Sequence, residues 1–145
     1  MSLAMIGNQA AFEFRWRRWA LLRDTVMSLE PSAGRFPHLY LIGDALAHGS
    51  LRVSAAALGE EVRSAMTLMA GRTLDDLAIS PSTAAVLYLG TKLDAPRPLT
   101  VHERNQIAPP GSATDLAEYF RSICESMLEV CRHPLDDGHI EILDG

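Results

Sequence analysis

Long hydrophobic runs are missing from this 145-residue sequence. Its longest uninterrupted apolar stretch, residues 84–89, has six residues, whereas a membrane-spanning helix needs about 20. The N-terminus also lacks the basic region, apolar stretch and cleavage site of a secretory signal. We therefore expect a cytoplasmic protein with no membrane partner.

Cysteine is scarce: Cys124 and Cys131 are the two in the chain. On one predicted helix their backbones would lie about 10 Å apart, because each residue adds about 1.5 Å. A disulfide needs Cα atoms within about 7 Å, so an intact helix keeps the two from bonding to each other. We expect two buried thiols that act as small apolar side chains. His133 would lie about half a turn away from Cys124, so the three do not predict a metal site.

The familiar catalytic signatures are also absent. The sequence has no glycine-rich phosphate loop, no HExxH, no CxxC and no Gly-x-Ser-x-Gly motif. We therefore expect no cofactor and no metal, and we favour a protein that is not an enzyme.

What is present is the composition of an ordinary globular protein, with 48% hydrophobic and 21% charged residues. A chain of this length usually forms one domain and buries about 68–70% of its unfolded surface. We predict a single domain over residues 1–145, in which residues 1–8 are disordered or an expression scar.

Negative charge is concentrated at the C-terminal end. The net charge of the chain is −5. Residues 1–30 carry a net +1, residues 31–110 are neutral, and residues 111–145 carry a net −6. An acidic end repels phosphate groups, so we expect no nucleic-acid partner. It suits a basic partner, or it serves solubility alone.

Apolar periodicity, helix caps and chain breakers predict the secondary structure. Helices are expected at residues 18–29, 36–48, 55–70, 81–89 and 115–132. Strands are expected at residues 11–17, 50–53, 99–102 and 139–143. The fold class that follows is α+β, with four or five helices packed on one face of a small, mainly antiparallel sheet.

The N-terminal segment "AFEFRWRRW" supports more than one interpretation. Aromatic and charged residues alternate over residues 11–17, which is the period of a half-buried strand. A helix capped by Asn8 is the alternative, but it would place Arg23 within its apolar face. Mixed Arg and Trp also occur in nucleic-acid and membrane-binding segments. We prefer a strand whose aromatic residues face the core and whose arginines face solvent or the C-terminal acids.

The segment 115–132 carries the clearest helical pattern. Its apolar residues gather on one side, and its acidic residues line the opposite side. The acidic residues are Asp115, Glu118, Glu125 and Glu129. We predict that they bind a basic protein partner, which would make the chain an inhibitor-, immunity- or adaptor-like protein without catalytic activity. The alternative is that they are only the solvated side of an amphipathic helix.

Two other function classes stay open. The proline-rich segment 91–112 is unusually long for an irregular loop, and a small enzyme would use His102, Glu103 or Arg104 there. A homo-oligomer, such as a homodimer, would bury Trp16 and Trp19 between subunits. Asp44 and His48 are four residues apart on a predicted helix, where we expect a surface pair rather than a catalytic or metal site.

Overall fold

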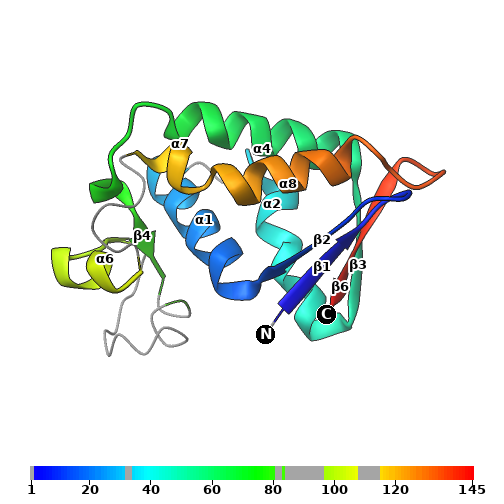
Figure 1. Ribbon diagram of the computed structural model, residues 1–145, viewed down its shortest axis with the longest axis horizontal. Coiled ribbons are helices and arrows are strands. Elements are labelled where there is room, and N and C mark those ends of the chain that lie inside the picture. The colour runs from blue at the N-terminus through cyan, green and yellow to red at the C-terminus, as the bar shows by residue number, and fades with distance from the viewer. Residues whose placement is uncertain (1, 32–33, 81–82, 84–96, 108–114) are drawn as a thin grey trace.

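The computed structural model describes residues 2–31, 34–80, 83, 97–107 and 115–145. A four-stranded antiparallel sheet lies at one end of the molecule, and helices pack against one of its faces (Figure 1). A two-stranded sheet and a short helix lie at the other end. The architecture is α+β, as predicted.

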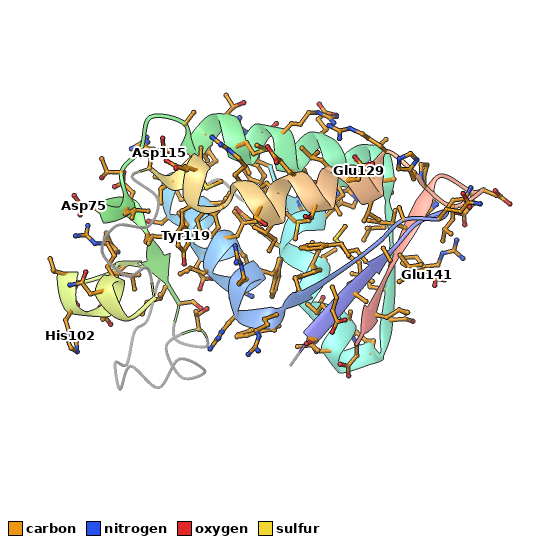
Figure 2. The ribbon with its side chains drawn as sticks, in the orientation of Figure 1. Asp75, His102, Asp115, Tyr119, Glu129 and Glu141 are labelled. Atoms are coloured by element: carbon orange, nitrogen blue, oxygen red, sulfur yellow. The ribbon has the colours of Figure 1, made fainter. Side chains whose placement is uncertain are left out.

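The large sheet has the order β2-β1-β6-β3, so β2 and β3 are its edges. The strands are β1 (Ser2–Ile6), β2 (Ala11–Arg15), β3 (Ser50–Ser54) and β6 (His139–Asp144). Successive side chains point to opposite faces, and β1 and β6 bury Leu3, Met5, Ile140 and Ile142 beneath the helices. Glu141 points away from the helices on the other face (Figure 2).

The helices α4 and α8 run side by side between the two sheets, with α1 and α2 beneath them in this view (Figure 1). The main helices are α1 (Trp16–Leu29), α2 (Pro37–Leu41), α3 (Ala45–His48), α4 (Ala55–Met69), α6 (Val101–Ile107), α7 (Leu116–Tyr119) and α8 (Arg121–Cys131). The remaining elements are the 3-10 helices η1 (Ile42–Asp44) and η2 (Leu74–Asp76) and the small strands β4 (Ala78–Ile79) and β5 (Arg97–Pro98). None of the described helices combines the length and apolar character that a membrane crossing demands.

The N-terminal residues correct one prediction. Residues 2–6 are not disordered but form β1, which pairs with both β2 and β6. Leu3 and Met5 are fully buried, so this strand is part of the core. The strand predicted at 11–17 ends at Arg15, and α1 begins at Trp16.

The segment 99–102 corrects another prediction. It is not a strand: β5 precedes it, and α6 begins at Val101. Thr100 and Glu103 form a reciprocal helix cap, in which the Glu103 N–H donates to Thr100 Oγ1 and the Thr100 N–H donates to Glu103 Oε1. The predicted helix at 81–89, apart from the helical Thr83, lies outside the described residues, as do residues 91–96 and 108–112 of the predicted loop.

Two predicted helices are each divided. The segment 116–131 breaks at Phe120, which is fully buried and has φ −94° and ψ 3°. The segment 37–48 passes through η1, where a side chain at Gly43 would collide with the Trp19 ring. The Trp19 indole N–H donates to the Leu39 carbonyl at 2.8 Å, which locks this close approach. Core packing therefore sets both breaks.

Candidate functional site

The outer face of α7 and α8 presents most of the predicted acidic residues. The inner face buries Leu116, Phe120, Ile123, Cys124, Met127 and Val130. Glu118, Glu125 and Glu129 are exposed on the opposite side, as the helical period requires. They line one hollow of about 480 Å³ together with Arg121, Ser122 and Ser126. The structure thus brings three of the four predicted site residues onto one surface.

Asp115, the fourth, has a structural role. It is half-buried and caps α7, because its Oδ1 accepts the Glu118 N–H at 2.7 Å. It does not line the acidic hollow. Figure 2 shows Asp115 and Glu129 near opposite ends of the α7–α8 segment.

A second hollow adjoins the first, between α8 and the β1–β2 hairpin. It has a volume of about 530 Å³. Its lining on the hairpin side is Asn8, Gln9, Ala10, Ala11 and Phe12, and on the α8 side it is Ser126, Glu129, Val130 and His133. Ser126 and Glu129 line both hollows. The two hollows therefore form one surface, which we call the acidic groove.

The hairpin is fixed against the end of α8. The Asn8 N–H donates to the His133 carbonyl at 2.7 Å, and the Gly7 N–H closes the hairpin on the Ala10 carbonyl at 2.8 Å. A side chain at Gly7 would collide with the His133 carbonyl oxygen, so the close approach requires glycine. The wall of the acidic groove is consequently a backbone held at a defined distance from α8.

Strand β2 lies beside the acidic groove and is an edge of the large sheet. It pairs with β1 on one side, and no strand among the described residues covers its other side. In an antiparallel ladder, alternate residues direct their N–H and C=O groups to the partner strand. The closing bond at Gly7 and Ala10 therefore directs the groups of Phe12 and Phe14 toward β1 and those of Ala11 and Glu13 outward.

Ion pairs hold one carboxylate of the acidic groove in place. Glu129 accepts from Arg132 Nη1 at 3.0 Å and contacts His133 Nε2 at 3.2 Å. The hydrogen bond from Arg132 has the largest effect, and together with that from His133 it lowers the pKa of Glu129 below its usual value. Glu129 is therefore ionised at neutral pH.

The two cysteines are free thiols. Cys124 is fully buried, and Cys131 is half-buried, so the prediction of buried thiols is confirmed for the first and is too strong for the second. Burial raises the pKa of Cys124 to about 12 and that of Cys131 to about 11. Within the ranges the structure describes, His, Cys, Asp and Glu nowhere form a group of three that would hold a metal ion.

The residues of the predicted loop site have separate positions. Glu103 is 6% exposed and forms a two-pronged ion pair with Arg97, with N–O distances of 2.7 and 2.8 Å. His102 is exposed on α6 (Figure 2), and Arg104 forms an ion pair with Asp75. Glu103 and Arg104 thus join α6 to neighbouring segments. Asp44 ends η1 and His48 ends α3, and both are exposed.

The aromatic segment has its residues placed as the strand interpretation expects. Phe14 and Trp19 are buried, whereas Phe12 and Trp16 are half-buried against the core. Arg15, Arg17 and Arg18 are exposed. Trp19 belongs to the core of its own chain and is not free to enter an interface between subunits.

The sequence patterns did not identify two buried carboxylates, Asp24 and Glu61, as important residues. Asp24 is fully buried and accepts the Ser80 N–H at 2.9 Å and the Thr83 hydroxyl. Glu61 is 8% exposed and holds the start of α2. Both were overlooked because their partners lie far along the chain, where local periodicity carries no information.

Comparisons with protein-family models, with curated proteins and with solved structures each give no match to this chain.

Proposed function

We propose that this chain is a non-catalytic protein-binding module, inhibitor-, immunity- or adaptor-like, whose acidic groove receives a basic segment of a partner protein. One observation supports this most: the hollow lined by Glu118, Glu125 and Glu129 continues into a hollow beside the β2 edge, which no described strand covers. Charge and backbone donors and acceptors are thus presented together. Such a surface suits a peptide better than it suits a small molecule.

The binding mode follows from the two walls of the acidic groove. An extended segment would add to the β2 edge through the outward backbone groups of Ala11 and Glu13, as in other cases of strand addition. Phe12, half-buried in the lining of the acidic groove, would supply apolar contact. Arginine or lysine side chains of the partner would reach Glu125 and Glu129 across the acidic groove.

Charge would act mainly on the rate of association. Each exposed ion pair contributes about 0.2–1 kcal/mol, so pairs with Glu118, Glu125 and Glu129 would together add modest affinity. Their summed field attracts a basic partner over distances of about one Debye length, about 8 Å at physiological salt. Most of the affinity must come from strand addition and apolar contact.

The test compares two charge-reversal variants as baits in a pull-down from the native host at low salt. E118K/E125K/E129K reverses the acidic groove. D44K/D136K/D144K makes the same change of charge at exposed residues that do not line it. A stoichiometric basic partner, retained by wild type and the control but lost from the groove variant, is the expected result. Equal retention by all three baits would refute the acidic groove as the interface.

The other function classes have less support in the described residues. A small enzyme with a site over residues 91–112 would use His102, Glu103 or Arg104, and the last two of these are engaged in ion pairs with Arg97 and Asp75. A homodimer would be visible as twice the chain mass in native mass spectrometry, and a dimer that excludes the partner would replace the present proposal.

A further inference from the structure

The outer face of α4 carries a hollow of opposite charge to the acidic groove. It has a volume of about 630 Å³. Arg35, Arg63 and Arg72 line it, and Glu60 is the acidic residue in its lining. The lining is therefore positively charged in a chain whose net charge is −5.

Three segments position these arginines. Glu60, Arg63, Ser64, Thr67 and Leu68 follow the three- and four-residue spacing of one helix face. Arg72 lies just beyond the end of α4, after Gly71 turns the chain with φ +76°. Arg35 comes from the segment that leads into α2. The arginines thus converge from different elements instead of following one another along a single surface helix.

The guanidinium groups keep donors free for a ligand. Arg35 uses Nη1 on Glu30 at 2.8 Å, and Arg72 lies 3.9 Å from Asp76. Neither acid lines the hollow. Arg63 is exposed and forms no ion pair with any residue that the structure describes. A guanidinium has five N–H donors, so most of the donors of these three side chains are available.

The remaining lining indicates the class of ligand. Arginine forks match the geometry of phosphate oxygens. The hydroxyl of Ser64 lies on the same face, and Leu68 and Ala70 add apolar surface. The volume falls in the range of about 300–1,000 Å³ that is usual for small-molecule sites and exceeds what a free phosphate ion fills.

We propose that this hollow binds a small organic phosphate ester, with the phosphate on Arg63 and its neighbours and the organic part on Leu68 and Ala70. Glu60 would accept a hydrogen bond from a hydroxyl or amino group of the ligand. This site is separate from the acidic groove, since the two share no lining residue.

The probes are phenyl phosphate, inorganic phosphate and benzyl alcohol, titrated calorimetrically into the full chain. Phenyl phosphate should bind most tightly, inorganic phosphate at least threefold more weakly, and benzyl alcohol should not bind. Equal affinity for the two phosphates would overturn the role of the apolar surface. No binding of phenyl phosphate at millimolar concentration would overturn the site.

Substitutions locate the binding. R63Q should weaken phenyl phosphate at least tenfold, and R63K should weaken it less, because lysine keeps the charge but loses the fork. R17Q removes another exposed arginine, one outside this hollow, and should leave the affinity unchanged. An unaltered affinity in R63Q, or equal losses in R63Q and R17Q, would show that the anion binds without using this hollow. Arg63 and Arg17 are exposed, so R63Q, R63K and R17Q are all expected to fold, and circular dichroism checks this.

Discussion

Glu61 holds His38 by both its backbone and its ring. Glu61 Oε1 accepts the backbone N–H groups of His38 at 2.9 Å and Leu39 at 3.1 Å, while Oε2 lies 2.5 Å from His38 Nδ1. One carboxylate of α4 therefore satisfies the first turn of α2, where Phe36 supplies no side-chain cap. This relationship joins the two helices more tightly than apolar contact alone.

Removing the Glu61 carboxylate should destabilise the folded protein. We expect E61A to lower the free energy of unfolding by about 2–4 kcal/mol, because the buried N–H of Leu39 and the part-buried N–H of His38 lose their acceptor. Urea denaturation monitored by tryptophan fluorescence measures the change. E60A removes the exposed neighbouring carboxylate and should stay within about 0.5 kcal/mol of wild type. Equal stabilities for E61A and E60A would contradict the capping role.

Removing the Asp24 carboxylate should destabilise the fold more than removing that of Glu61. It joins α1 to Ser80 and Thr83, and it pairs with Arg23 at 3.0 Å. Arg23 in turn lies 4.6 Å from the centre of a Trp19 ring. D24A leaves several polar groups without partners, and we expect a loss of about 3–5 kcal/mol in unfolding free energy.

A milder variant separates the parts of this network. T83V removes one hydroxyl and should cost about 1 kcal/mol. Both values come from the same urea titrations. If D24A costs no more than T83V, the carboxylate is not the centre of the network.

Glu103 should make stability depend on acid pH. Its ion pair with Arg97, together with hydrogen bonds from Thr100, lowers its pKa from 4.5 to about 2. A carboxyl whose pKa is lower in the folded state stabilises the fold above its unfolded pKa. That contribution, about 2–3 kcal/mol, should be complete above pH 5 and disappear as the pH falls from about 4.5 to 2.

The measurement for Glu103 is a comparison of wild type with E103Q at several pH values. E103Q should be less stable at pH 7, and the difference should shrink toward pH 2. A difference that is constant with pH would assign the effect to packing and not to ionisation.

How much of this structure could be read from the sequence depended on the range of the interactions. The Ser54 cap and the apolar stripe of α4 are local, and both are present, with Ser54 Oγ accepting the Ala57 N–H at 3.2 Å. The helical face of α8 was also predictable, because three to four turns of regular spacing specify it. The break at Phe120 was not, because it depends on core packing.

Two local sequence patterns indicated the observed structure, but neighbouring features of the sequence favoured a different prediction. Leu3 and Met5 alternate with smaller side chains, the pattern of a strand, but their place at the terminus suggested disorder. Thr100 and Glu103 have the spacing of a reciprocal helix cap, but the surrounding prolines suggested an irregular loop.

The acidic groove was only half predictable. Helical spacing brings Glu118, Glu125 and Glu129 together, and the sequence shows that spacing. The second wall needs the β1–β2 hairpin to lie against α8 with Asn8 bonded to His133, and this is a contact between distant parts of the chain. The arginine hollow on α4 has the same origin, because Arg35 and Arg72 reach Arg63 only in the folded chain.

The thiols should be nearly inert in the folded protein. The thiolate is the reactive form, and burial raises the pKa of Cys124 to about 12 and that of Cys131 to about 11. At pH 8 we expect neither to react with an aromatic disulfide reagent within minutes, and both to react at once in denaturant. Because Cys131 is half-buried and Cys124 fully buried, Cys131 should be the first to react as the pH rises. C131S should abolish this early phase and leave a thiol that reacts only on unfolding, whereas an early phase that persists in C131S would place Cys124 within reach of solvent.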